Sequence, residues 1–178
     1  WLAVAYIEFI RGTPLMVQLM FIFYGLPMVG FTLPDISWIP NFSRFSAGII
    51  AMSINSCAYV AEIIRSGVQA VDVGQMEAAR SVGFSHGQAM RLVVLPQAFA
   101  VSVPPLVANI IFLIKEISVV SAIALPDLMY VTKDLIGNSY KTDESLILLV
   151  SAYVVLLLPI SLLGYWLEKK VRYAGFGN

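Results

Sequence analysis

Long apolar stretches alternate with shorter polar segments along this chain. A helix of about 20 apolar residues, rising about 1.5 Å per residue, crosses a hydrocarbon core about 30 Å thick. We expect membrane-spanning helices at about residues 14–33, 45–66, 104–123 and 145–167. The pattern therefore predicts an all-α polytopic membrane protein with one domain over residues 1–178.

Prolines predict irregular backbone at two places in these stretches. Pro14 suits the first turn of a helix, where its missing N–H leaves no hydrogen bond unmade. A residue before proline avoids the α region, so Pro104 and Pro105 predict a break near Val103. We therefore expect a slanted entry helix at about residues 93–102, followed by the third span.

Three polar segments separate the four spans. Residues 34–44 and 126–144 contain Pro, Asn, Asp, Lys and Arg, and they predict loops, the second with a short interfacial helix. Residues 67–91 are called the polar loop below. The polar loop predicts two short helices around Gly83, because glycine readily adopts positive φ angles in sharp turns.

Positive charges are divided unequally between the two sides of the membrane. Cytoplasmic loops are enriched in Lys and Arg. The richer side carries seven: Arg11, Arg65, Arg80, Arg91, Lys169, Lys170 and Arg172. The other side carries three: Arg44, Lys133 and Lys141. The polar loop and the C-terminus are therefore expected to be cytoplasmic.

The composition excludes several classes of protein. The chain is 59% hydrophobic and 12% charged, whereas soluble domains usually carry about 25% charged residues. A formal net charge of zero provides no basic footprint for nucleic acid. The single cysteine, Cys57, excludes an intrachain disulfide framework, and we expect no metal or cofactor. No phosphate-binding G-x-x-x-x-G-K-(S/T) loop is present, so nothing in the sequence indicates ATP hydrolysis by this chain.

Two adjacent charges, Lys115 and Glu116, lie inside the third predicted span. Each charge at a bilayer centre costs about 2.5 to 3.5 kcal/mol, and neighbouring helix residues do not face each other. Each charge therefore needs another partner or a wet cavity, and such residues commonly mark substrate paths. A ligand that carries both a carboxylate and an ammonium would suit Lys115 and Glu116, respectively. The alternative is that both charges lock helices together, or that the span lies shallower.

A polar face in the second span is the other candidate for substrate contact. Asn55, Tyr59 and Glu62 have i, i+4, i+7 spacing and share one helix face. Asn55 and Tyr59 are the candidates to line a cavity. Alternatively, Asn55 bridges helices, Tyr59 packs, and Glu62 pairs with Arg65 three residues later.

Four motifs together resemble one family of transporters. In the polar loop, Glu77-Ala78-Ala79 is followed after six residues by Gly83, and Leu95-Pro96 begins twelve residues later. This resembles the EAA loop of bacterial ABC-importer permeases, of the histidine/glutamine/arginine type for polar amino acids. Three further segments are similar to motifs of that family: Tyr6-Ile7-Glu8-Phe9-Ile10-Arg11-Gly12-Thr13-Pro14, Ser53-Ile54-Asn55-Ser56-Cys57-Ala58-Tyr59-Val60-Ala61-Glu62, and Leu113-Ile114-Lys115-Glu116-Ile117-Ser118.

The resemblance implies a type I ABC-importer transmembrane domain that lacks the family's first helix, in a bacterial cytoplasmic membrane. It implies three kinds of protein partner: cytoplasmic ABC ATPase subunits, an extracellular or periplasmic amino-acid-binding protein, and a second permease subunit. The residues implied to dock the ATPase are Glu77, Ala78, Ala79, Gly83 and Phe84. The residues implied to contact substrate are Lys115, Glu116, Ser118, Asn55 and Tyr59. Ile117 stands where the family usually has threonine, which puts the substrate class in question.

Two alternatives remain at this stage. A passive channel or a secondary transporter would need no ATPase, although secondary transporters often show internal repeats and none is visible here. A membrane enzyme would need a catalytic constellation, and one histidine, one cysteine and no clustered acids argue against it.

Overall fold

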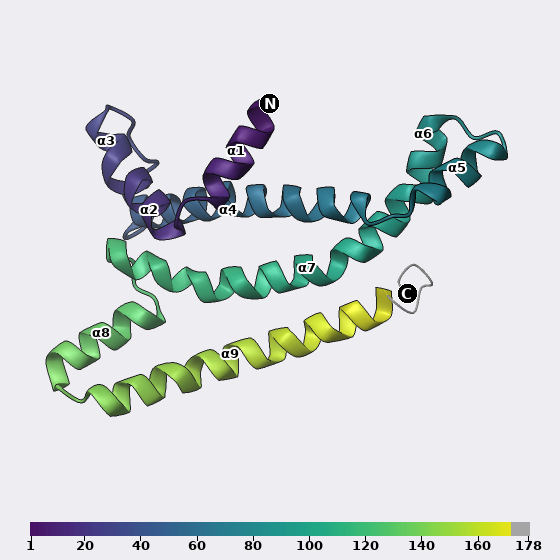
Figure 1. Ribbon diagram of the computed structural model, residues 1–178. Helices are drawn as coiled ribbons and strands as arrows, with labels where there is room; N and C mark the ends of the chain where they lie inside the picture. The colour runs from purple at the N-terminus through teal and green to yellow at the C-terminus, as the bar shows by residue number, and fades with distance from the viewer. Residues whose placement is uncertain (172–178) are drawn as a thin grey trace. The chain divides into compact units, whose positions relative to one another are not determined.

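The computed structural model describes residues 1–171, and this part of the chain is helical without any strand (Figure 1). Arg172, which was counted among the cytoplasmic charges, lies outside the described residues. The α-helices are α1 (Leu2–Arg11), α2 (Leu15–Met20), α3 (Leu26–Met28), α4 (Phe42–Gln69), α5 (Val73–Ser81), α6 (His86–Ala89), α7 (Leu95–Glu116), α8 (Leu128–Ser139) and α9 (Thr142–Val171). Two π-helical turns, η1 (Phe21–Gly25) and η2 (Met90–Val94), and a 3-10 helix, η3 (Ile117–Ile123), continue them. The predicted all-α class is confirmed.

Three continuous helical stretches in the described residues are long and apolar enough to cross a membrane: Phe42–Gln69, His86–Ile123 and Thr142–Lys170. A fourth candidate is a broken pair, Leu2–Arg11 with Leu15–Met28, which bends by 105° between its halves. Lipid supplies no hydrogen-bond partners, so a helix that satisfies its own backbone is the form that such apolar segments adopt. The expected spans at 45–66 and 145–167 lie inside α4 and α9.

The predicted break at Val103 is wrong. Helix α7 runs without interruption from Leu95 to Glu116, with Pro104 and Pro105 inside it. A proline removes one backbone hydrogen bond, and in a membrane helix the neighbouring bonds persist because no water competes for them. Helix α9 likewise continues through Pro159. The separate entry helix at 93–102 is therefore part of the same continuous helical stretch, His86–Ile123.

The chain packs as two compact units, each described here by itself. The first unit contains Trp1–Ala58 and Phe112–Pro159. Its core joins α2, η1, α4 and η3, and consists of Leu15, Leu19, Ile22, Ala47, Ala51, Val120 and Ile123. A Cβ added at Gly48 would lie 3.3 Å from Val120 Cγ1, so glycine allows η3 to pack closely on α4. The core therefore holds η3 firmly against α2 and the beginning of α4.

The second unit contains Tyr59–Ile111 and the chain from Ile160 onward. Its helices approach one another at two glycines. A Cβ at Gly67 of α4 would lie 2.8 Å from the Ala98 carbonyl oxygen of α7. A Cβ at Gly164 of α9 would lie 2.5 Å from Val107 Cγ1. Small residues at such contacts let membrane helices pack through their backbones.

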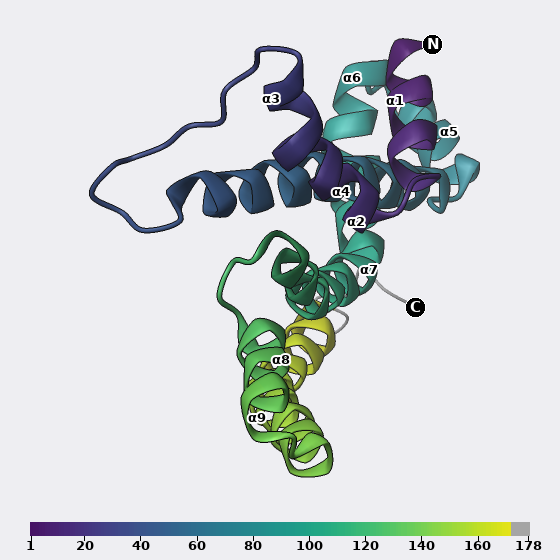
Figure 2. The same ribbon diagram turned by 90° about the vertical axis from the view of Figure 1, so that its left-hand side faces the viewer.

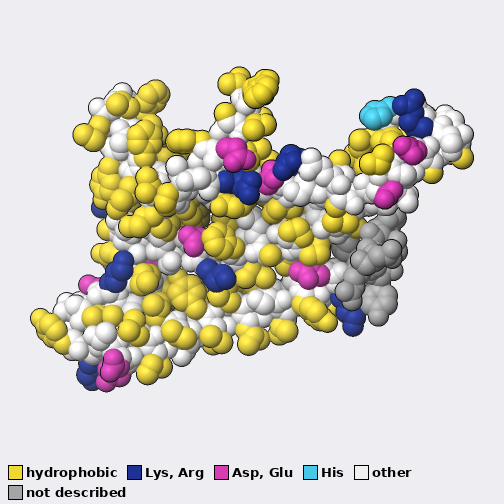
Figure 3. Space-filling model, in the orientation of Figure 1, with side chains coloured by type: hydrophobic (Ala, Val, Ile, Leu, Met, Phe, Trp, Pro, Cys, Tyr) yellow, Lys and Arg dark blue, Asp and Glu magenta, His cyan; other side chains and the backbone are white. Residues whose placement is uncertain are grey.

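Helix α9 exposes many apolar side chains along its length. Ile147, Val155 and Leu163 are 67%, 75% and 63% exposed. Figure 3 shows hydrophobic side chains over much of α7 and α9, and the histidine together with charged groups over α5 and α6; further charged groups lie elsewhere on this face. Near the end of α9, Lys170 Nζ lies 5.1 Å from the Trp166 ring centroid. Aromatic and basic residues together are typical of a helix end at the membrane interface.

The loop between α3 and α4 is the longest non-helical segment in the described chain, and Figure 2 shows it extending away from α3. It covers residues 29–41 and overlaps the loop expected at residues 34–44, the last three of which begin α4. Asn41 adopts a positive φ of 61° immediately before α4, and its side-chain oxygen accepts a hydrogen bond from Arg44. The expected interfacial helix at 126–144 is α8, whose N-terminal amides donate to the Asp127 carboxylate.

Candidate functional site

The polar loop folds into two short helices, each capped by its own side chains. The Gly74 N–H donates to Asp72 Oδ1 at 2.7 Å at the beginning of α5. At α6, the Ser85 N–H donates to Gln88 Oε1 at 2.9 Å, and the Gln88 N–H donates back to Ser85 Oγ at 3.4 Å. This capping box satisfies two amides that the first turn of a helix leaves free. The predicted pair of helices around Gly83 is confirmed.

Gly83 closes α5 in a left-handed turn, with a φ of +94°. Its N–H donates to the Arg80 carbonyl at 3.1 Å, and the Phe84 N–H reaches back to the Ala79 carbonyl at 3.2 Å. These two bonds form a Schellman motif, in which glycine follows the last helical turn because it adopts a positive φ without steric penalty. No atom lies within 4 Å of a Cβ placed at Gly83, so the backbone angle alone requires glycine here.

The predicted docking residues divide into exposed and buried ones. Glu77, Ala78, Gly83 and Phe84 are exposed, and the Phe84 ring retains 37% of its surface. Ala79 is only 6% exposed. Ala79 therefore faces inward on α5, and its implied part in docking stays a prediction. The exposed face of the turn therefore comprises the other four residues.

A side-chain bond connects this turn to the beginning of α7. Gln97 Nε2 donates to Gln75 Oε1 of α5 at 3.3 Å and to the Val93 carbonyl at 3.0 Å. The π-helical turn η2 leads from α6 directly into α7, and Val94 within it is 5% exposed. The start of α7 is thus joined to α5 through Gln97 and to α6 through the continuous chain.

A polar network holds the sharp bend between α1 and α2 in the first unit. Gln18 Nε2 donates to the Ile10 carbonyl at 2.8 Å and to Thr13 Oγ1 at 2.8 Å. Thr13 Oγ1 donates to the Phe9 carbonyl at 2.9 Å, which satisfies the end of α1. Asn55 Nδ2 donates to Gln18 Oε1 at 3.2 Å, so α4 joins the network. Thr13 thus caps the end of α1 rather than the beginning of α2.

Asn55 is 4% exposed and its amide bridges two helices. This matches the alternative in which asparagine ties helices together, and its contact with substrate stays a prediction. Tyr59, one turn later, is half-buried. Glu62 and Arg65 form the ion pair expected from their spacing.

Lys115 and Glu116 lie at the end of α7, where it changes into η3. Within residues 1–171, neither side chain makes a hydrogen bond or an ion pair with another residue. Lys115 is exposed and Glu116 is half-buried. The two charges therefore do not neutralise each other, as their adjacent positions on a helix require.

The Ser118 side chain forms a hydrogen bond with the backbone at the end of α7. Its Oγ donates to the Lys115 carbonyl at 3.0 Å, which satisfies an acceptor where the α-helical pattern changes. The hydroxyl oxygen keeps its lone pairs for a ligand. On the far side of η3, Lys133 Nζ of α8 donates to Ser121 Oγ at 3.0 Å. The segment that carries the charged pair is thus fixed by α7 on one side and by the core and α8 on the other.

No cluster of three metal-binding side chains occurs in the part of the chain that the structure describes.

The family described as "Binding-protein-dependent transport system inner membrane component" matches residues 1–173. The chain belongs to this family. The resemblance based on the four motifs is thereby confirmed, and the chain is a membrane-embedded transport component.

The sequences of individual relatives align with nearly the whole of this chain. The probable glutamine ABC transporter permease protein GlnM of Bacillus subtilis is 40% identical over 97% of this chain and 76% of its own length. The arginine transport system permease protein ArtQ of the same organism is 39% identical over 97% of this chain and 75% of its own length. The crystal structure of an amino acid ABC transporter with histidines matches with a TM-score of 0.83 and 43% identity, over 94% of this chain and 74% of that chain.

Several residues that hold these sites together were not expected from the sequence. Gln18, Gln75 and Gln97 are isolated amides in apolar or mixed segments, and no spacing rule identifies their distant partners. The caps were recognisable, because Ser85 and Gln88 have the S-x-x-Q spacing of a capping box. Asp72 directly before α5 is an equally familiar N-cap.

The bond between Gln18 and Asn55 should contribute measurably to stability. We expect Gln18→Met and Asn55→Ala to be less destabilising together than the sum of the single changes. The coupling energy should be about 0.6 kcal/mol, the average for such bonds between membrane helices. Unfolding in mixed detergent, followed by circular dichroism, measures it. Strictly additive effects would show that the two amides act independently.

Proposed function

We propose that this chain is the membrane-spanning subunit of an ABC importer for a polar amino acid, driven by ATP hydrolysis on a separate cytoplasmic subunit. The observation that carries this proposal is the α5–Gly83–α6 turn, an exposed and rigidly capped element in a chain that is a family member over residues 1–173. The relatives named above are permeases for glutamine and arginine, so the cargo belongs to glutamine, glutamate, basic amino acids or similar compounds.

The exposed face of the turn suits docking of an ATPase. Both helices are capped internally, so the turn keeps its shape without a partner, and binding needs little ordering. Phe84 offers an exposed apolar ring beside Gly83, and the carboxylate of Glu77 lies on the exposed side of α5. An aromatic anchor of this kind fits a pocket on a partner protein. The Gln75–Gln97 bond supports transmission of movement from this face to α7.

The charged pair suits the two ends of an amino acid. Lys115 offers an ammonium to a carboxylate, and Glu116 offers a carboxylate to an ammonium. Charge-assisted hydrogen bonds of this type contribute about 1.5 to 3 kcal/mol each. Their lack of a partner within the described residues leaves both groups open for this purpose. Ser118, Asn55 and Tyr59 are the further proposed contacts in the membrane.

Orientation and assembly complete the proposal. The polar loop and C-terminus face the cytoplasm of a bacterial cell, because Lys and Arg are enriched on that side. Two permease subunits pair to enclose the pathway, and an extracellular or periplasmic binding protein delivers the amino acid at the opposite face. ATP binding moves the α5–α6 turn and switches access between the two sides. A passive channel or a secondary transporter would have no reason to keep an internally capped docking element.

The role of the α5–Gly83–α6 turn in docking can be tested by adding one methyl group at Gly83. We expect Gly83→Ala to reduce co-purification of the ATPase several-fold, because a positive φ is unfavourable for alanine by about 1 kcal/mol or more. Gly87→Ala is the matched control, since Gly87 lies in α6 with nothing within 4 Å of an added Cβ and no positive φ. Equal recovery of ATPase with both variants would remove the turn from the docking site.

The charged pair can be tested by ATP turnover of the purified complex. We expect amino acid plus binding protein to stimulate turnover, and Lys115→Met to require at least about tenfold more substrate for half-maximal stimulation. Lys141→Met, at an exposed position between α8 and α9, is the control for loss of a positive charge. Unchanged stimulation in Lys115→Met would refute the substrate contact, whereas absence of any stimulation in the unaltered complex would refute the importer.

A further inference from the structure

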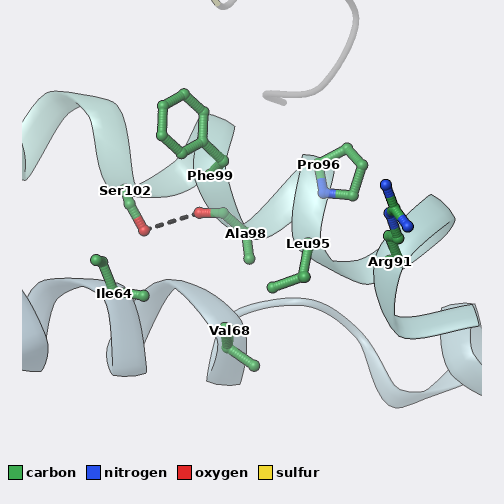
Figure 4. Close-up of a pocket in the computed structure, with 8 residues that line it drawn as sticks. All are labelled: Ile64, Val68, Arg91, Leu95, Pro96, Ala98, Phe99 and Ser102. Atoms are coloured by element: carbon green, nitrogen blue, oxygen red, sulfur yellow. Dashed lines mark hydrogen bonds between the residues drawn. The ribbon is translucent and has the colours of Figure 1, made fainter. Parts of the chain in front are cut away.

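A groove runs between α4 and the η2–α7 segment in the second unit. It has a volume of about 430 Å³ and is lined by Ile64, Val68, Arg91, Leu95, Pro96, Ala98, Phe99 and Ser102. Figure 4 shows Arg91 beside Pro96 at one end of this row and Ser102 at the other. This α4–α7 groove belongs to neither the proposed docking face nor the charged pair.

Small residues on the two helices produce the hollow. A Cβ on Gly67 would lie 2.0 Å from Ser102 Oγ, so the backbones come close at this point. Ala98 is buried between the helices, whereas Ile64, Leu95 and Phe99 are 49%, 44% and 65% exposed. The larger side chains therefore line the sides of a shallow groove, and the small residues form its base. Seven of the eight lining residues are uncharged, so the groove requires an apolar occupant along most of its length.

The polar group at the deep end is already satisfied. Ser102 Oγ donates to the Ala98 carbonyl at 2.8 Å, and Figure 4 draws this bond. An occupant at this end therefore needs no hydrogen-bonding group. At the opposite end, Arg91 is exposed and makes no hydrogen bond or ion pair with any residue in the range 1–171. The groove thus combines an apolar body with a single cationic end.

The position and length of the groove match one leaflet of a bilayer. Arg91 follows α6 directly, where the polar loop ends and the apolar helix begins. From Arg91 to Ser102 the helix rises by about 16 Å, at about 1.5 Å per residue. Half of a hydrocarbon core is about 15 Å thick. An acyl chain whose headgroup lies at Arg91 would therefore extend as far as Ser102.

Charge decides between a lipid and a protein as occupant. A protein segment that covered the groove would take Arg91 out of water, which is unfavourable unless a carboxylate accompanies it. A phospholipid phosphate meets Arg91 at the membrane surface, where the guanidinium remains partly hydrated and can bind two phosphate oxygens. We propose that the α4–α7 groove binds one anionic phospholipid, with its phosphate on Arg91 and an acyl chain along Leu95 and Phe99 beside Ile64 and Val68.

The test uses the complete transporter complex in bilayer nanodiscs of phosphatidylcholine with a minor fraction of phosphatidylglycerol. The probe is a phosphatidylglycerol that carries a photoreactive diazirine in one acyl chain, and mass spectrometry locates the labelled peptides. We expect labelling between Leu95 and Ser102, with excess phosphatidylglycerol competing better than phosphatidylcholine. Labelling at these residues does not depend on transport, so it is independent of the proposed function.

Two variants test the two ends of the site separately. Arg91→Gln should reduce labelling about fivefold, the loss expected for one basic residue at a membrane surface. Val68→Trp should reduce it by filling the groove without any change of charge. Arg44→Gln is the control for loss of a positive charge, because Arg44 lies outside the groove and bonds Asn41. It should leave the labelling unchanged. Equal labelling in Arg91→Gln, equal competition by phosphatidylcholine, or no labelling between Leu95 and Ser102, as expected if another protein covers the groove, would overturn the proposal.

Discussion

Every polar group that enters the membrane must find its partner within the protein, and this constraint accounts for most of the structure. Hydrocarbon offers no hydrogen bonds, so the chain is helical wherever it is apolar. At two places where the helix changes direction or type, a side chain replaces a lost backbone partner. Gln18 and Thr13 do so at the 105° bend between α1 and α2. Ser118 does so where α7 becomes a 3-10 helix.

The same constraint gives a physical meaning to the charged pair. Gln18 bonds Asn55, and Glu62 pairs with Arg65, so each of these side chains has a partner within the protein. Lys115 and Glu116 are different, because no hydrogen bond or ion pair joins either of them to another residue within the described chain. Ionised groups in a membrane are unfavourable without a partner, and their retention is understandable if a transported molecule supplies that partner.

Much of the fold follows from the sequence because its signals are local. The length of the apolar stretch in α4 and the positive φ required at Gly83 need no knowledge of distant contacts. The capping box at Ser85 and Gln88 is equally local and was readable, although we did not predict it. The break expected at Pro104 did not occur, because the preference of a pre-proline residue is weaker than the demand for continuous hydrogen bonds in an apolar helix.

The parts that could not be predicted depend on tertiary contacts. Gln18 meets Asn55 across 37 residues of sequence, and nothing in either segment identifies the other. Ala79 is 6% exposed, and nothing in the local sequence distinguishes it from its exposed neighbour Ala78. The α4–α7 groove arises from Gly67 and Ala98 in different helices, so it too becomes visible only in three dimensions.

The most direct test of the account is amino-acid uptake by proteoliposomes that contain the purified complex and its binding protein. ATP is supplied only on the side of the ATPase, and ion gradients are imposed separately. The account predicts that a polar amino acid accumulates against its gradient with ATP and does not accumulate with proton or sodium gradients alone. Accumulation driven by an ion gradient without ATP, or simple equilibration without any energy source, would contradict it.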